Sequence, residues 1–159
     1  MNKMGSPVRT RIATLADLDT VAALFDAYRQ FYEQPADLVL ATHFIGERLR
    51  NHESVILLAL GDDESVLGFC QLYPSFCSVE ARPIYCLYDL FVDPAARRGG
   101  AGKQLLIEAE RLAAANGMVR LDLTTARSNL AAQAAYESLG WVRDAVFLAY
   151  NKAVPSVRR

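Results

Sequence analysis

The chain has 159 residues, 52% hydrophobic and 22% charged, a composition typical of a globular domain and unlike that of disordered proteins. Its 17 basic and 18 acidic residues leave a net charge of −1, which argues against binding to nucleic acid. The longest aliphatic run, Val55–Leu60, is far shorter than the ~20 residues that span a bilayer, and no secretory signal is expected. We therefore expect a single domain over residues 1–159, with a core of about 8–151 and no membrane partner.

The three cysteines, Cys70, Cys77 and Cys86, indicate the redox setting of the protein. They are odd in number and form no C-x-x-C pair, which argues against a disulfide framework and against a zinc site. We predict reduced thiols, no bound metal and a cytoplasmic location.

The pattern of apolar residues predicts both strands and helices along the chain. A strand at Val8–Ile12 comes first, followed by a helix that Thr14 can cap and that runs to about Glu33, ahead of the helix breaker Pro35. The order βααβββαβαβ predicts an α/β domain with a mixed sheet. The remaining elements are expected at Leu38–Asn51 (helix), Val55–Leu60, Val66–Tyr73 and Ile84–Val92 (strands), Gly100–Asn116 (helix), Val119–Thr125 (strand), Asn129–Leu139 (helix) and Val142–Asn151 (strand).

A glycine-rich turn joins the strand that ends at Val92 to the helix that starts at Gly100. Without a Cβ, its glycines let a ligand approach the unpaired N–H groups of the first helical turn. The helix dipole and the neighbouring cations favour an anion there, such as a pyrophosphate. The residues concerned are the glycines Gly99, Gly100 and Gly102 and the cations Arg97, Arg98 and Lys103.

Two common phosphate-binding patterns do not fit this turn. The dinucleotide fingerprint G-x-G-x-x-G fails because Leu105 stands where its last glycine belongs, and the Walker pattern fails at Arg97 and Gln104. The pattern R-x-x-G-x-G does fit, from Arg97 to Gly102. Taken alone, this segment could also be a tight turn that carries exposed basic side chains.

With two further segments, the turn resembles the GNAT superfamily of acetyl-CoA-dependent N-acetyltransferases, whose cofactor loop has the form Q/R-x-x-G-x-G/A. Leu90–Pro94 is similar to the family's preceding strand and proline. The resemblance covers about Arg9–Asn151, is closest to the histone, polyamine and D-amino-acid acetyltransferase branch, and implies a single domain with a mostly antiparallel sheet flanked by helices. The family's second element, N-x-x-A-x-x-x-Y-x-x-L-G-[FW], is matched by Asn129, Ala132, Tyr136, Leu139, Gly140 and Trp141.

The resemblance implies that acetyl-CoA is the cosubstrate. Strand backbone would hold its pantetheine arm, and the amides of the turn would take its pyrophosphate. A backbone N–H near Phe91 would polarise the thioester carbonyl. The implied cofactor-binding residues are Leu90, Phe91, Val92, Arg97, Arg98, Gly99, Gly100, Ala101, Gly102, Lys103, Asn129 and Tyr136.

Tyr136 and Asp89 are the candidate catalytic residues. Tyr136 follows Asn129 by seven residues, which places both on nearly the same helix face, and the resemblance implies that it protonates the departing CoA thiolate. It could also be a core aromatic residue, and Asn129 could be only a helix cap. Asp89, an acid inside an apolar strand, could be the general base or a structural hydrogen-bond partner.

The general base stays open between Asp89, Tyr73 and a water chain. Spermidine/spermine acetyltransferases carry a glutamate at the position of Tyr88, so their proposed base has no counterpart here.

The predicted acceptor is a primary amine of a small molecule, such as a polyamine or an amino acid, or an exposed lysine. The aromatic group Tyr28, Phe31 and Tyr32 is expected mainly in the core by its spacing. The alternative function is a CoA-binding regulatory or partner module without turnover, and a homodimer is left open. The candidate substrate-binding residues are Tyr28, Tyr32, Glu33 and Tyr73.

Overall fold

The computed structural model describes residues 7–157. These residues separate after Thr124 into two compact units, of which the first holds the sheet with helices α1 to α3 and the second holds α4. No helix in the described residues is long and apolar enough to cross a membrane. The elements are β1 (Arg9–Ile12), η1 (Leu15–Asp17), α1 (Leu18–Phe31), α2 (Leu38–Arg50), β2 (Val55–Leu60), β3 (Val66–Cys77), β4 (Arg82–Val92), η2 (Pro94–Ala96), α3 (Ala101–Ala115), β5 (Leu121–Asp122) and α4 (Leu130–Ser138).

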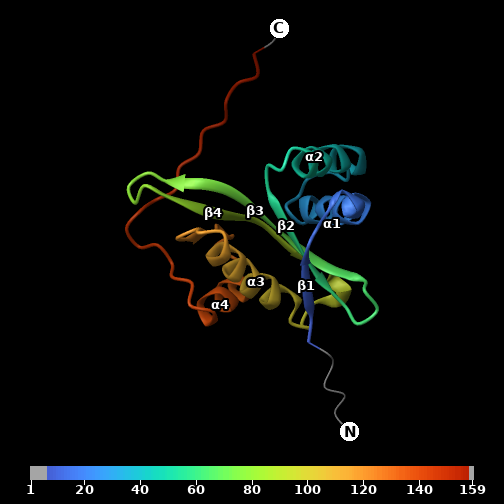
Figure 1. Cartoon of the computed structure of the whole chain (residues 1–159). Helices are drawn as coiled ribbons and strands as arrows, with labels where there is room; N and C mark the ends of the chain where they lie inside the picture. Colours follow the sequence, from blue (N-terminus) through green and yellow to red (C-terminus); the bar gives the residue numbers. More distant parts are fainter. Residues whose placement is uncertain (1–6, 158–159) are drawn as a thin grey trace. The chain divides into compact units, whose positions relative to one another are not determined.

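The sheet of the first unit has the strand order β1-β2-β3-β4-β5, with antiparallel pairs from β1 to β4 and a parallel pair between β4 and β5. Figure 1 shows α1 and α2 on one face of this sheet and α3 on the other. Side chains alternate between the faces, so Leu58, Phe69 and Phe91 share the core with α1 and α2. The predicted α/β fold with a mixed, mostly antiparallel sheet is confirmed.

The predicted C-terminal strand is wrong. Residues 142–151 form neither a helix nor a strand, and their side chains are exposed. Alternating apolar residues make a strand only when a neighbour supplies the backbone hydrogen bonds, and within the described chain this segment has no ladder partner. The strand expected at Val119–Thr125 is likewise reduced to Leu121–Asp122, so the observed element order is βααβββαβα.

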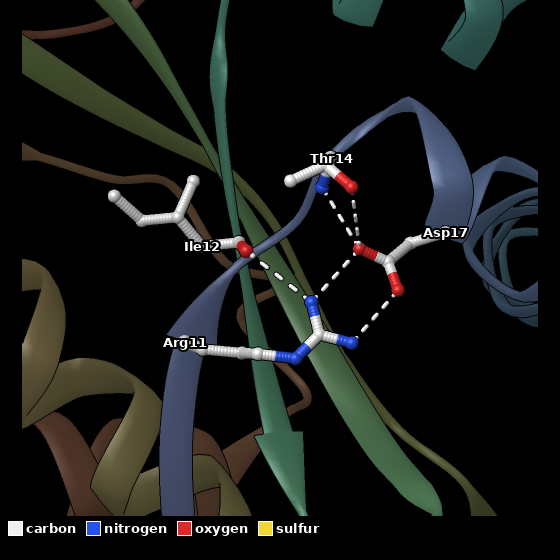
Figure 2. A network of polar contacts seen from close by, with 4 residues as sticks. All are labelled: Arg11, Ile12, Thr14 and Asp17. Carbon is white, nitrogen blue, oxygen red and sulfur yellow. Dashed lines mark hydrogen bonds and ion pairs between the residues drawn. The ribbon is translucent and has the colours of Figure 1, made fainter.

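The link from β1 into α1 is fixed by one carboxylate (Figure 2). Asp17 accepts a hydrogen bond from the backbone N–H of Thr14 at 2.8 Å. The Arg11 guanidinium donates one hydrogen bond to each oxygen of the same carboxylate, both at 2.8 Å. This pairing holds the pKa of Asp17 at about 2, below its ordinary value of 3.8, with the hydrogen bond from Arg11 as the main cause. The predicted start of the helical segment at Thr14 is therefore confirmed, with η1 preceding α1.

Replacing Asp17 by asparagine should destabilise the protein by about 1 kcal/mol at pH 7, because the ion pair is lost while an oxygen remains for Thr14. Since folding lowers the pKa of Asp17, its stabilisation is present above about pH 4 and disappears as the pH falls toward 2. Urea unfolding of both proteins across this range measures the difference. Arg9→Met, which removes the exposed Arg9–Glu64 pair, is the control and should change stability little. A difference that stays constant down to pH 2 would contradict this account.

Candidate active site

The pairing of β3 with β4 contains a β-bulge at Tyr88. Gln71 lies opposite Asp89, whereas the next residue of β3, Leu72, lies opposite Leu87, so β4 carries one extra residue. The Tyr88 side chain is 71% exposed, while Asp89 is only 3% exposed. Asp89 shares the register position of Gln71 and the core residue Ile56, on the sheet face that α1 and α2 cover.

A chain of hydrogen bonds ends on the Asp89 carboxylate. The hydroxyl of Ser54 donates to Oε1 of Gln71 at 2.7 Å, and Nε2 of Gln71 donates to Oδ2 of Asp89 at 2.5 Å. From α1, the Tyr28 hydroxyl donates to the backbone carbonyl of Tyr88 at 3.3 Å. An ionisable group, a buried amide and the bulge thus lie together at the middle of β4.

Burial is the main cause of the pKa shifts of the ionisable side chains around Asp89. It raises the pKa of Asp89 above its ordinary value, and the hydrogen bonds from Gln71 and Tyr28 oppose that rise. Burial, followed by the charge of Asp89, also raises the pKa of Tyr28, and the same causes raise the pKa of Tyr73 to about 12. Tyr73 is therefore protonated at neutral pH and is a poor base, whereas a carboxylate with a raised pKa is a stronger base than usual.

Beyond the bulge, no strand of the described chain pairs with the outer edge of β4. Among the described residues, β5 pairs only with Tyr85 and Cys86 of β4. The N–H of Asp93 donates to the Leu67 carbonyl on the β3 side at 2.8 Å, so the carbonyl of Val92, in the same trans peptide, points away from β3.

Alternation along the strand then decides which residues of β4 offer their backbone at this edge. The backbone N–H and C=O groups of Leu90 point away from β3, as those of Val92 do, whereas those of Phe91 point toward β3. Two of the three predicted pantetheine-binding residues, Leu90 and Val92, therefore present N–H and C=O groups at the edge. The N–H groups near Phe91 that can polarise a carbonyl belong to these two neighbours rather than to Phe91 itself.

The glycine-rich turn leads from this edge into α3. Arg98 and Gly100 have left-handed backbone conformations, with φ of 66° and 86°, and Gly100 is the N-cap of α3. A Cβ at Gly102 would lie 3.6 Å from Cγ2 of Val92, an ordinary contact, so the fold itself does not require a glycine there. Lys103 and Arg98 are exposed beside the N–H groups that begin α3, as an anion site requires.

Arg97, the first residue of the cofactor pattern, is directed toward β4. Its Nε donates to the Val92 carbonyl at 3.1 Å, and its guanidinium lies 5.5 Å from the ring centre of Phe91 and 5.9 Å from that of Phe31. The side chain therefore covers part of the free edge, and its contact with a pyrophosphate stays a prediction.

Of the four predicted substrate-binding residues, the three tyrosines pack against other aromatic rings and Glu33 is exposed. Tyr73 packs edge-on against Tyr88 with ring centres 5.7 Å apart, and Tyr28 packs in the same way against Tyr32 at 5.1 Å. Glu33 is exposed just after α1, with φ of 63°. The prediction that the α1 aromatic group lies mainly in the core is wrong for Phe31 and Tyr32, which are 56% and 46% exposed because α1 ends at Phe31 and leaves the core.

Two residues of the site, Gln71 and Ser54, escaped the sequence analysis. Gln71 is completely buried in the otherwise apolar run from Phe69 to Leu72, the same signal that drew attention to Asp89. Nothing in the sequence marks Ser54 as a site residue, because a serine ahead of a strand is common.

In the second unit, α4 carries the other two candidates. Oδ1 of Asn129 accepts a hydrogen bond from the N–H of Ala132 at 3.2 Å, which confirms the capping role of Asn129. Tyr136 is partly buried, its ring centre 6.0 Å from that of Trp141, and Gly140 ends the helix with φ of 89°. The roles of Asn129 and Tyr136 toward a ligand stay predictions.

Comparisons with known proteins agree with this arrangement. Residues 19–141 match the model of the acetyltransferase (GNAT) family. The chain is 46% identical over 146 residues to the uncharacterized N-acetyltransferase YhfO of Bacillus subtilis (strain 168), covering 92% of this chain and 97% of the relative. A crystal structure described as a probable acetyltransferase superposes with a TM-score of 0.87 at 40% identity, covering 93% of this chain and 99% of the other.

The fold also extends to more distant acetyltransferases. The aminoglycoside acetyltransferase meta-AAC0020, from an uncultured soil metagenomic sample, has a TM-score of 0.78 at 16% identity, over 93% of this chain and 97% of the other, a likeness in fold alone. The family model, by contrast, matches most of the chain, and the GNAT family uses acetyl-CoA as its cosubstrate. The protein is therefore an acetyltransferase that belongs to the GNAT family.

Proposed function

We propose that the protein transfers an acetyl group from acetyl-CoA directly to a primary amine, either of a small molecule such as a polyamine or an amino acid, or of an exposed lysine. The observation that carries this proposal is the segment Asp89–Val92, which joins a buried proton acceptor to a free strand edge. We further propose a single cytoplasmic domain over the whole chain, related most closely to the histone, polyamine and D-amino-acid branch.

Acetyl-CoA would supply the activated acetyl thioester. The outward C=O of Leu90 and N–H of Val92 would pair with its pantetheine arm as a neighbouring strand would, and the amides between Arg98 and Lys103 would bind the pyrophosphate. The N–H of Leu90, the edge residue next to Asp89, would donate to the thioester carbonyl and stabilise the negative charge that develops on its oxygen.

The acceptor must attack as a free amine, yet an alkylammonium ion has a pKa of about 10.4 and is mostly charged at neutral pH. Asp89 would take this proton, since burial raises its pKa and makes its carboxylate a stronger base. Two exposed aromatic rings would favour the approach of a cation: that of Tyr88, next to Asp89 in β4, and that of Tyr32, which packs on Tyr28. Tyr136 would then donate its hydroxyl proton to the departing thiolate, without an acetyl-enzyme.

A panel of amines tests the acceptor class. We expect CoA release that depends on acetyl-CoA with at least one of spermidine, the amino acids of both hands, or a lysine-containing histone-tail peptide, and mass spectrometry should locate the acetyl group on nitrogen. Calorimetric binding of acetyl-CoA with no CoA release for any of these amines would instead favour a CoA-binding module without turnover.

Gly102→Asp should weaken acetyl-CoA binding at least ~100-fold, because a carboxylate beside the pyrophosphate would repel it. Folding should survive, because the added Cβ makes only an ordinary contact with Val92. Calorimetry with acetyl-CoA measures the affinity. Ala115→Asp, which adds the same charge at the exposed far end of α3, is the matched control. Equal affinities of the wild type and the folded Gly102 variant would place the phosphate site elsewhere.

Asp89→Asn should lower kcat/KM by about 10²-fold, most strongly at low pH where free amine is scarce, while acetyl-CoA affinity stays nearly constant. Burial raises the pKa of Asp89, so its ionisation costs stability as the pH rises through that pKa. The variant should therefore gain thermal stability relative to the wild type at pH 8 and lose this advantage toward pH 4. A loss of both activity and stability that is equal at every pH would make Asp89 purely structural.

Tyr136→Phe removes a proton donor and almost no volume, so acetyl-CoA binding should change little. General acid catalysis contributes about 10²- to 10⁴-fold, and we expect the low end because a thiolate is a tolerable leaving group. Single-turnover acetyl transfer at saturating substrates measures the effect, with the exposed Tyr150→Phe as the matched control. A ratio of wild-type to variant rates near one would reduce Tyr136 to a packing residue.

A further inference from the structure

Gln71 is a fully buried polar side chain in the middle of the sheet, where an apolar residue would pack at lower cost. It is 0% exposed and lies opposite Asp89 in the register of β3 and β4. A buried amide needs partners for both its oxygen and its nitrogen. Gln71 has them: Ser54 donates to its oxygen, and its nitrogen donates to Asp89.

The ionised Asp89 carboxylate can only accept, so it requires the NH₂ end of the amide, and Ser54 holds the oxygen at the other end. A carbonyl oxygen can only accept, so the short contact of 2.7 Å between Ser54 and Oε1 requires the serine hydroxyl to donate. With the oxygen held in this way, the NH₂ group must point to the carboxylate. The opposite orientation would set two oxygens against each other and leave the hydroxyl without this acceptor.

Gln71 in turn fixes the carboxylate of Asp89. Its contact of 2.5 Å is to Oδ2, which restricts rotation about the Cβ–Cγ bond. Tyr28 also hydrogen-bonds this carboxyl, and each carboxylate oxygen has two lone pairs, so Oδ1 keeps a site that can receive a proton. The other ionisable groups that act on this part of the site come from α1, the strands and the α2 region: Tyr28, Tyr32, Cys70, Tyr73, Tyr88, Arg48 and Glu53. The amide of Gln71 donates to the carboxylate itself without carrying a charge of its own.

We propose that Gln71, oriented by Ser54, is the positioning residue for proton removal by Asp89. The pair holds the carboxylate so that Oδ1 faces the acceptor amine. The N–H bond of the ammonium ion then breaks, an O–H bond forms at Oδ1, and the electron pair stays on nitrogen for attack on the acetyl carbonyl. This inference rests on the proposed role of Asp89 as the base.

The role predicts a change in the pH profile. A hydrogen bond from Gln71 favours the charged form of Asp89, so its loss should raise the pKa of the carboxyl. The acid limb of kcat/KM should then move to higher pH by about one unit, with about tenfold lower activity on that limb. On the plateau the loss should be smaller and should reflect only the freed rotation of the carboxylate.

The experiment compares Gln71→Met and Ser54→Ala with the wild type, using the most active amine of the panel at saturating acetyl-CoA. Ser54→Ala leaves Gln71 in place and only frees its amide, so it keeps the test open if Gln71→Met fails to fold. Ser54→Thr keeps the hydroxyl and should restore the wild-type profile. Ser65→Ala, which removes an exposed hydroxyl bonded to Asp63, is the matched control and should leave the profile unchanged.

A double-variant comparison separates this inference from the proposed role of Asp89. Adding Gln71→Met to Asp89→Asn should cause no further shift of the acid limb. If Asp89→Asn lowers activity as expected but the Gln71 and Ser54 variants change only thermal stability, the positioning role is overturned while the base stands. If Asp89→Asn is fully active, both the role of Asp89 as the base and the positioning role of Gln71 are wrong. A shifted limb in Gln71→Met and in Ser54→Ala, absent in Ser54→Thr, would support the positioning role.

Discussion

The structure around the site depends on one hydrogen bond, that from the Gln71 amide to the Asp89 carboxylate. An ionised carboxyl that loses water without gaining a partner is among the costliest features a protein core can contain. In this protein the partner lies directly opposite on the neighbouring strand, so the bond also ties β3 to β4 at the register shift. The same contact therefore holds the acid and links the two strands where their register shifts.

The bulge converts this local arrangement into a site. With one extra residue at Tyr88, β4 places an exposed ring and a buried acid side by side, and its edge beyond that point has no pairing strand among the described residues. The glycine-rich turn follows within the same segment and begins α3 with unpaired N–H groups. One continuous stretch of chain thus carries the residues to which we assign proton removal, pantetheine binding and pyrophosphate binding.

The sequence predicted the parts of this arrangement that are encoded locally. Helix α3 and the turn before it follow from apolar spacing and from glycines, and Asp89 stood out as an acid in an apolar strand. The register shift left no such mark, because Tyr88 is an ordinary strand residue and only pairing with β3 reveals it as extra. The same limit explains the errors: Phe31 and Tyr32 keep helical spacing past the point where α1 leaves the core, and the apolar pattern at 142–151 has no partner strand. The roles of Tyr136 and Asn129 toward a ligand rest on resemblance, and no contact in the structure tests them.

An open strand edge is also a hazard, because a strand from any other chain can add to it and start aggregation. Proteins commonly guard such edges with charge, and Arg97 does so here. Its guanidinium lies against Phe91 while its Nε occupies the carbonyl of Val92, so an intruding strand would have to displace a cation to pair there. Under the proposed function, the same charge would disfavour pairing with another polypeptide while a small ligand could still reach the Leu90 groups of this edge.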